Sequence, residues 1–382
     1  CLESSTTSDN NTAMGFEAMK SNTTGTRNTA IGSLALDSNI GGSDNTALGY
    51  ASLQATTSGT QNTAIGQKAL ENNSTASYNV ALGYQALEQN TTGSGNTALG
   101  RIALDENTTG DYNVGVGYGA LSSATTADEN VGVGFASLNQ LTTAARCVAV
   151  GPSALRYCTT GDDNTAVGRI ALNSVTTGHS NTAVGSTAGY QITTGIRNTA
   201  LGYLAADSLL TGSRHVAVGA YALQAVSSVD YLTAVGYGAL YANTSGIQNS
   251  AHGYAALFTN TTGSQNTACG YNALDHNTTG SYNTSVGYES STANTTGGYN
   301  TAIGARALES NVSGSRNTAV GYKALEDTGN GSDNTAVGWQ ALDDCAADNN
   351  TAVGSGALKL NTTGAANTAV GSESLDANTT GT

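Results

Sequence analysis

The chain is poor in charge and proline, and each shortage excludes a class of protein. Only 10% of its 382 residues are charged, and a single proline stands against 49 glycines. Collagen needs glycine at every third residue and abundant proline, so it is excluded. The net charge of −14 leaves no basic face that could neutralise nucleic-acid phosphates or bind anionic membranes. No stretch approaches about 18 consecutive apolar residues, so we expect no membrane insertion.

Signatures of catalysis and of metal binding are also missing. The four histidines fall in different parts of the repeat described below, without metal-ligand spacing. No nucleophile–base arrangement or phosphate-binding loop stands out, and nearly the same surface recurs along the whole chain. Catalysis needs a unique, preorganised constellation of residues. We therefore predict no catalytic site, no metal site and no cofactor, so that the protein is not an enzyme.

What the chain does contain is one phrase that recurs at every seventeenth position. Its consensus is Asn-Thr-Ala-Φ-Gly-Tyr-x-Ala-Leu-x-x-Asn-Thr-Thr-Gly-Ser-x, where Φ is aliphatic, and positions are numbered from the first Asn. The glycine of position 5 falls at Gly15 and at every seventeenth residue to Gly338, and then, after the loss of one residue, at Gly354 and Gly371. These 22 copies predict that residues 1–382 form a single array of stacked coils.

The two ends of the sequence resemble the middle. Neither end carries an atypical unit of the kind that caps solenoids, and Cys1-Leu2 lies in phase with the Ala-Leu pair of a repeat. We therefore expect the chain to be a window of a longer fibre. The alternative, a lipid-modified Cys1 at a mature N-terminus, is disfavoured by this match of phase.

Each coil contains two candidate segments of regular structure. A β-branched, alternating stretch of about five residues around positions 2–5 predicts a short strand, with an aliphatic face at position 4 and a thin Ala/Gly face. The Ala-Leu segment, with Leu at position 9 in 18 copies, is expected to form a second strand or an irregular extended side or, alternatively, one helical turn. The predicted fold is all-β, a parallel β-solenoid (β-roll) of about 22 stacked 17-residue coils.

Two asparagine positions predict a ladder inside the stack. Position 1 is Asn in 19 copies, and position 12 accepts Asn or a large aliphatic residue such as Leu141 or Val175, which indicates an inward-facing site. Buried amides must be hydrogen-bonded, and stacked coils would let them bond to one another and to the turn backbone. The ladder candidates are Asn28, Asn45, Asn62, Asn79 and Asn96. The alternative is that Asn serves only left-handed turn conformations.

Two further columns draw attention. Cys147 and Cys158 replace both asparagines of one coil, which suggests either a disulfide across that coil or two small buried thiols. Position 6 is aromatic in 12 copies, and four consecutive coils carry Tyr there: Tyr237, Tyr254, Tyr271 and Tyr288. Stacked coils would align these rings in a column that supports packing or a contact between chains, or alternatively binds glycans.

A slim coil predicts association between chains. Two large aliphatic side chains per coil contribute roughly 1.5–3 kcal/mol each when buried. Ordering every residue of the coil costs about 1–2 kcal/mol per residue, which adds up to far more. Packing several chains along their thin Ala/Gly faces would bury more surface, and a closed cyclic trimer meets this need.

The repeats resemble known fibre proteins. Asn-Thr-Ala-Ile-Gly (residues 28–32 and 300–304) and Asn-Thr-Ala-Val-Gly (residues 164–168 and 334–338) resemble the Asn-Ser-Val-Ala-Ile-Gly head repeat of trimeric autotransporter adhesins. They are also similar to the Asn-Thr-Ala-x-Gly arrays of bacteriophage tail fibres that end in an intramolecular chaperone. This resemblance implies a left-handed parallel β-roll, three chains per fibre and attachment to a surface. The adhesin repeat is shorter than the repeat of this chain.

These observations favour the structural shaft of an extracellular adhesive fibre, on a cell surface or a virion, that projects a receptor-binding tip. The expected partners are copies of the chain in a homotrimer or a higher fibre assembly. A first alternative is a rod that itself binds host glycans or another cell-surface receptor through the tyrosine column. A second is an ice-binding solenoid, because Thr recurs at positions 2, 13 and 14.

Overall fold

The computed structural model describes Ser4 and residues 6–382, and these are all-β, with strands joined by turns and no helix. Cys1, for which a lipid-modified terminus was weighed, lies outside the described residues. The chain divides into two units, unit 1 (Cys1–Thr194) and unit 2 (Gly195–Thr382). Each unit is a parallel β-solenoid in which every coil contributes one strand of three residues, shorter than the sequence predicted.

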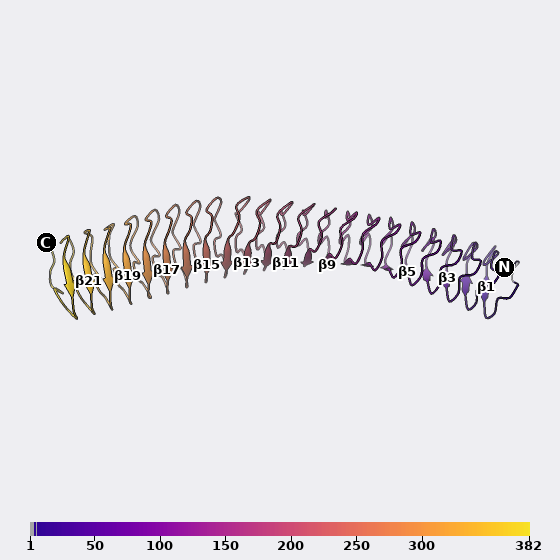
Figure 1. Cartoon of the computed structure of the whole chain (residues 1–382), viewed down its shortest axis with the longest axis horizontal. Helices are drawn as coiled ribbons and strands as arrows, with labels where there is room; N and C mark the ends of the chain where they lie inside the picture. The colour runs from indigo at the N-terminus through magenta and orange to yellow at the C-terminus, as the bar shows by residue number, and fades with distance from the viewer. Residues whose placement is uncertain (1–3, 5) are drawn as a thin grey trace. The chain divides into compact units, whose positions relative to one another are not determined.

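In unit 1 each strand pairs with the next in parallel, and Figure 1 shows their arrows side by side. The strands are β1 (Thr12–Met14), β2 (Thr29–Ile31), β3 (Thr46–Leu48), β4 (Thr63–Ile65), β5 (Val80–Leu82), β6 (Thr97–Leu99), β7 (Val114–Val116), β8 (Val131–Val133), β9 (Val148–Val150), β10 (Thr165–Val167) and β11 (Thr182–Val184).

Unit 2 repeats this arrangement with eleven further strands. They are β12 (Thr199–Leu201), β13 (Val216–Val218), β14 (Thr233–Val235), β15 (Ser250–His252), β16 (Thr267–Cys269), β17 (Thr284–Val286), β18 (Thr301–Ile303), β19 (Thr318–Val320), β20 (Thr335–Val337), β21 (Thr351–Val353) and β22 (Thr368–Val370).

The register follows the sequence period. Within each unit, a strand residue pairs with its equivalent in the next coil, as Ala30 does with Ala47. Between β20 and β21 the step is shorter by a single residue, from Thr335 to Thr351. The missing residue belongs to the turn after position 12, because the Cys345 thiol bonds to a carbonyl only two residues ahead, whereas Cys158 bonds to one three residues ahead. The turn absorbs the deletion, and the strand ladder continues.

The two faces of each strand are the reverse of the prediction. The small residue of position 3, such as Ala30 or Ala47, is fully buried, whereas the aliphatic residue of position 4 points outward, and Leu48 is 43% exposed. The interior is already filled by Leu of position 9 and two side chains from positions 1 and 12, so only Gly, Ala or the equally small Ser285 is found at position 3. The thin face therefore lies inside each coil, and chains cannot pack along it.

The Ala-Leu segment is neither a strand nor a helical turn. Positions 7 and 9 both have left-handed backbone torsions, with φ of 62° at Leu34 and 51° at Leu36. Between these residues the N–H direction reverses. Leu34 donates to the carbonyl of Phe16 in the preceding coil, and Leu36 to that of Ser52 in the following coil. These bonds between coils compensate for a backbone conformation that disfavours most residues.

Candidate functional site

Two asparagine columns fill the interior and meet at one carbonyl in each coil. The position 1 side chain Asn28 and the position 12 side chain Asn39 both donate to the Gly42 carbonyl, at 2.8 and 3.0 Å. Along most of the column, the position 1 amide oxygen also accepts the backbone N–H of the position 1 residue in the next coil. For the predicted residues these N···O distances are 2.8–3.0 Å, running from Asn28 through Asn45, Asn62 and Asn79 to Asn96. The columns are buried and most of their polar groups bond to one another or to the backbone, so their role is structural.

Cys147 and Cys158 occupy the two asparagine positions of one coil as buried free thiols. Both sulfurs bond to the Gly161 carbonyl, at 3.2 and 3.3 Å, which brings them together. The hydrogen bond with Cys147, aided by burial, raises the pKa of the Cys158 thiol and keeps it protonated. The disulfide between them stays a prediction.

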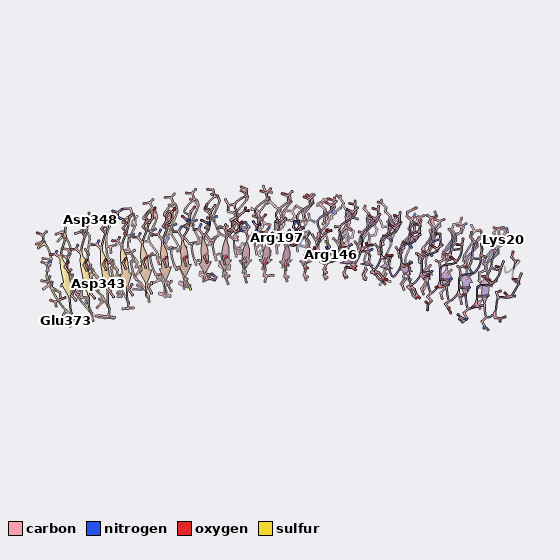
Figure 2. All side chains as sticks on the ribbon, viewed as in Figure 1. Lys20, Arg146, Arg197, Asp343, Asp348 and Glu373 are labelled. Atoms are coloured by element: carbon pink, nitrogen blue, oxygen red, sulfur yellow. The ribbon has the colours of Figure 1, made fainter. Side chains whose placement is uncertain are left out.

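The outer surface carries the residues that are free to meet a partner. Figure 2 labels charged side chains in both units, for example Lys20 and Arg146 in unit 1 and Asp343 and Glu373 in unit 2. Within the described residues, no group of three or more His, Cys, Asp or Glu is arranged to hold a metal ion. The same part of the chain has no helix long and apolar enough to cross a membrane. The strongest local concentration of one kind of side chain is aromatic, and it lies in unit 2.

The corner after each strand sets this aromatic column. Gly253 ends β15 with φ of +140°, and a Cβ added there would collide with the Gly270 carbonyl oxygen of the next coil. Only glycine therefore allows adjacent coils to turn together at this point. The residue that follows, Tyr254 here, leaves the corner pointing outward and is 49% exposed.

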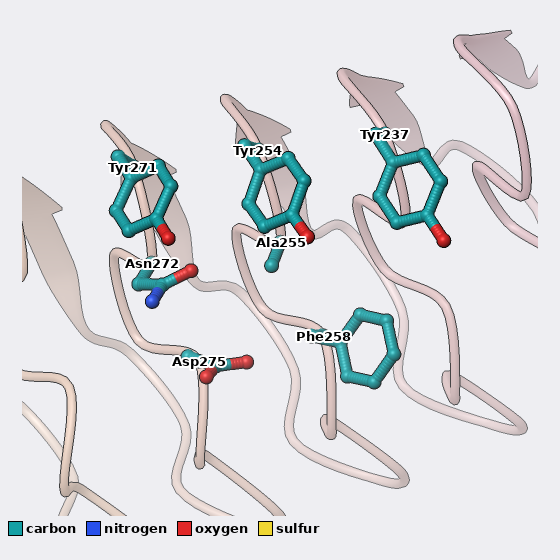
Figure 3. A pocket seen from close by; sticks show the side chains of 7 residues that line it. All are labelled: Tyr237, Tyr254, Ala255, Phe258, Tyr271, Asn272 and Asp275. Carbon is teal, nitrogen blue, oxygen red and sulfur yellow. The ribbon is translucent and has the colours of Figure 1, made fainter.

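The four predicted tyrosines form one stack. The ring centroids of Tyr237, Tyr254, Tyr271 and Tyr288 follow one another at 5.2, 5.2 and 5.4 Å, with interplanar angles of 10–11°. Figure 3 shows the first three rings in a row with their hydroxyl groups on the same side. The stack is half-exposed along its length, so it presents a repeated phenol surface.

A second aromatic row, from position 10, was not predicted. Tyr241 and Phe258 stack at 4.7 Å with an angle of 7°. Tyr221, at position 7, packs edge-on against Tyr237 at 5.6 Å and near Tyr241 at 6.4 Å. Comparing the variable positions of neighbouring copies could have revealed this row, because position 10 is aromatic in two successive copies, Tyr241 and Phe258, and position 7 is aromatic only at Tyr221.

Between the two rows lie two adjoining open hollows, which together we call the aromatic groove. One hollow of about 280 Å³ is lined by Tyr221, Tyr237, Tyr241 and Phe258. It adjoins a second of about 410 Å³, which Tyr237 and Phe258 share with Tyr254, Ala255, Tyr271, Asn272 and Asp275. In Figure 3 the tyrosine hydroxyls point toward the row of Phe258 and Asp275. The groove thus offers ring surfaces, an amide and a carboxylate.

Charge is uneven along the groove. Burial raises the pKa of Asp275, and the neighbouring His276 opposes this shift. Beyond Tyr271, the hydrogen bond to Glu289 raises the pKa of Tyr288. Arg306 then contacts Glu289 at 3.4 Å and Glu309 at 3.7 Å, so an ion-pair cluster takes the place of aromatic residues. The cluster ends the groove on the side of Asp275.

Unit 1 uses the same columns differently. Arg101 lies over the rings of Tyr84 and Tyr118, at 5.4 and 5.3 Å, and donates to the Tyr118 hydroxyl. Lys68, at position 7, bridges Glu71 and Glu88, which both occupy position 10. The fold therefore accepts ion pairs where unit 2 has the groove.

The chain was compared with protein-family models, with curated proteins and with solved structures, and none of the three comparisons finds a match.

Proposed function

We propose that the chain is the structural shaft of an extracellular adhesive fibre, a surface adhesin or a phage tail fibre, in which three copies pack side by side and project a receptor-binding tip. The observation that carries this proposal is a mainly aliphatic stripe of exposed and partly exposed side chains on the strand face of each unit, interrupted in unit 2 by His252 and Cys269. We call the outward side chains of position 4 the outer stripe. In unit 1 it runs from Ile31 to Val184, and every strand between them contributes an aliphatic residue.

The stripe favours a second copy of the chain as its partner. Contiguous exposed apolar surface of this kind marks interaction sites. A partner that covers the stripe from coil to coil must have the same axial repeat, and another copy of this chain has it. A globular partner would cover only a few coils. Closed packing of three copies around one axis would bury the stripe along its length.

The inner ladders suit a shaft. At position 13 the hydroxyl of Thr91 donates to the carbonyl of Thr108, and Thr108 donates likewise to Thr125, both at 2.9 Å. Each coil is thus bonded to its neighbour through strand, turn and side chains. Because these bonds are the same from coil to coil, a shaft can lengthen by adding coils of the same kind. The same bonds weaken the ice-binding alternative, since these hydroxyls are already committed to the protein.

Light scattering of the full chain tests the proposal, and we expect the mass of a trimer. Leu99→Glu with Val150→Glu places charges on the outer stripe and should give monomers. Thr109→Glu with Thr160→Glu adds the same charges to exposed sites of the same two coils and should leave the trimer intact. A monomeric parent chain would contradict the assembly.

Cys269 offers an independent readout. It lies in the outer stripe at the end of β16 and is exposed, whereas the other described cysteines are buried. In a parallel trimer joined through the stripe, the three copies of Cys269 lie at the same height. A short bismaleimide should then join chains covalently, and Cys269→Ser should abolish the product. A trimer that does not cross-link would place the interface on another face.

A further inference from the structure

We propose that the aromatic groove of unit 2 binds a neutral oligosaccharide of hexopyranose rings. This goes beyond a shaft function, because the site lies within one chain and does not depend on assembly. The groove combines ring surfaces with hydrogen-bonding groups at fixed places, as ligand sites do.

The fold does not require these aromatic residues. The equivalent positions hold Arg306 and Glu309 a few coils away in the same unit, where they form an ion pair instead. Tyr237, Tyr254 and Tyr271 are each 45–49% exposed, so much of their apolar surface contacts solvent instead of stabilising the fold. Exposed position 6 rings such as Tyr118 occur elsewhere, but only this run of coils sets the stacked pair Tyr241–Phe258 beside the position 6 stack. Such a local concentration of aromatic surface is typical of a binding site rather than of a structural repeat.

The shape of the groove selects the class of ligand. A pyranose ring has a face of C–H groups that packs on an aromatic ring, and a rim of hydroxyl groups that hydrogen-bonds. The tyrosine rings stack on one another, so they turn their edges and hydroxyl groups to the groove, where they can hydrogen-bond the sugar rim together with Asn272 and Asp275. The Phe258 ring in the other row supplies apolar surface for the C–H face. The rings repeat at 5.2 Å in nearly parallel planes. A repeated surface of this kind fits an extended chain of rings better than a single compact molecule.

Charge excludes acidic ligands. Asp275 lines the groove, Glu289 and Glu309 lie just beyond it, and the whole chain has a net charge of −14. Arg306 is already paired with both of these glutamates, so it is not free to bind an anion, and Asp275 and the excess negative charge would repel a uronic acid polymer or a phosphate-bearing ligand. A neutral sugar meets no such penalty and can donate its hydroxyl hydrogens to the carboxylate.

Calorimetric titration of the full chain tests the site with cellohexaose, chitohexaose and maltohexaose, and with hexagalacturonate as the acidic counterpart. We expect at least one neutral hexasaccharide to bind and hexagalacturonate not to bind. Tyr254→Ala should weaken binding about tenfold, because one stacked ring is lost, and Phe258→Ala should act similarly. Circular dichroism and hydrogen exchange would show that substitution of the exposed Tyr254 and of the half-buried Phe258 preserves the fold.

Tyr118→Ala is the matched control, because Tyr118 is also a position 6 ring stacked on its neighbour, Phe135, at 5.6 Å. It should leave sugar binding unchanged. Asp275→Asn should let hexagalacturonate bind measurably, and unchanged discrimination would refute the argument from charge. The proposal is overturned if no neutral hexasaccharide binds, or if Tyr118→Ala weakens binding as much as Tyr254→Ala. It is equally overturned if Tyr254→Ala alters only the oligomeric mass, which would assign the groove to another copy of the chain.

Discussion

Two stretches of unit 1 build the same coil around different interiors. In residues 62–112, position 12 is Asn73, Asn90 and Asn107. The amides of Asn90 and Asn107 donate to the oxygen of the preceding Asn, at 2.9 and 2.8 Å, and the Asn73 amide donates to the hydroxyl of Thr56 at 3.4 Å. In residues 130–180, position 12 is Leu141, Cys158 and Val175, all fully buried. Both stretches keep the same strand register and the same corner glycine.

The difference shows that position 12 accepts either Asn or an aliphatic side chain. The fold loses stability, however, at each coil where a run of Asn ends. The last Asn of a run leaves its side-chain oxygen without a partner, because the next coil offers no amide. This happens at Asn39, Asn107 and Asn311. An orphaned buried acceptor costs about 1–3 kcal/mol. Position 12 therefore changes in runs rather than coil by coil, which keeps such junctions few.

The largest expected effect concerns the corner that both stretches share. Gly100→Ala and Gly151→Ala should each destabilise by more than about 4 kcal/mol, because the added Cβ overlaps the next glycine carbonyl at a φ of +140° or +130°. Thermal unfolding monitored by circular dichroism measures the loss. The two variants should be equally damaging, and a marked difference would mean that the interior also sets the corner.

Exchanging the interiors should have the next largest effect. Asn90→Leu removes the amide between Asn73 and Asn107 and leaves the Asn73 oxygen unpaired. Val175→Asn places an amide between Cys158 and Ile192, with no ladder on either side. We expect losses of about 2–3 kcal/mol for each, from orphaned polar groups. Hydrogen exchange measures this loss in the altered coil and the coils next to it, since each coil contacts only its neighbours. If either variant were as stable as the parent chain, orphaned polar groups could not explain why Asn and aliphatic residues occur in runs at position 12.

The period alone could reveal the fold but not its faces. Equal spacing of the position 5 glycines predicts stacked coils with parallel strands in register, and alternation at position 12 between Asn and aliphatic residues predicts an inward site. The same strand pattern, Thr-Ala-Ile, fits either face inward, because alternation does not say which side is buried. What decides is the volume left beside Leu36 and the asparagines, and that depends on how tightly the coil closes.

The Ala-Leu segment escaped prediction for a related reason. Leu favours helix and rarely adopts a left-handed torsion, yet Leu36 has one because its N–H finds a carbonyl only in the next coil. Local propensity cannot express a bond that exists only after stacking. Likewise the tyrosine column was visible in one repeated position, whereas the groove needs Tyr241 and Phe258 from a variable one.

The two stretches should also respond differently to pH. Burial, with Glu88 and Glu106 nearby, raises the pKa of Asp105 to about 6. Its unfolded pKa is lower, so its contribution to stability is complete below about pH 4 and is lost as the pH rises through about 6. Discounted for partial exposure, we expect a loss of about 1 kcal/mol, or about fivefold lower protection in this coil, measured as exchange corrected for intrinsic rate. Asp105→Asn should flatten the response.

In residues 130–180, stability should depend on pH in the opposite direction. A hydrogen bond from Arg146 lowers the pKa of the exposed Asp163 carboxylate. Its contribution is therefore present above the unfolded pKa and is lost as the pH falls through the folded pKa. Protection near Asp163 should decrease only in acid, and Arg146→Gln should remove that decrease. A decrease on raising the pH in both stretches would contradict the assignment to Asp105.

The smallest effects are expected at the two buried thiols. Replacing Cys147 by Asn should restore the hydrogen bonds of the position 1 column, whereas replacing Cys158 by Asn should restore none. Cys147 interrupts the position 1 column, in which Asn130 below and Asn164 above carry amides. Cys147→Asn restores an acceptor for the backbone N–H of Asn164 and should stabilise by about 0.5–1 kcal/mol. Cys158 lies between Leu141 and Val175, so Cys158→Asn gains only the Gly161 carbonyl and should destabilise slightly. Denaturation under reducing conditions, with local hydrogen exchange, distinguishes the two. If both variants changed stability in the same direction, the neighbours in the column would not determine which side chain the interior prefers.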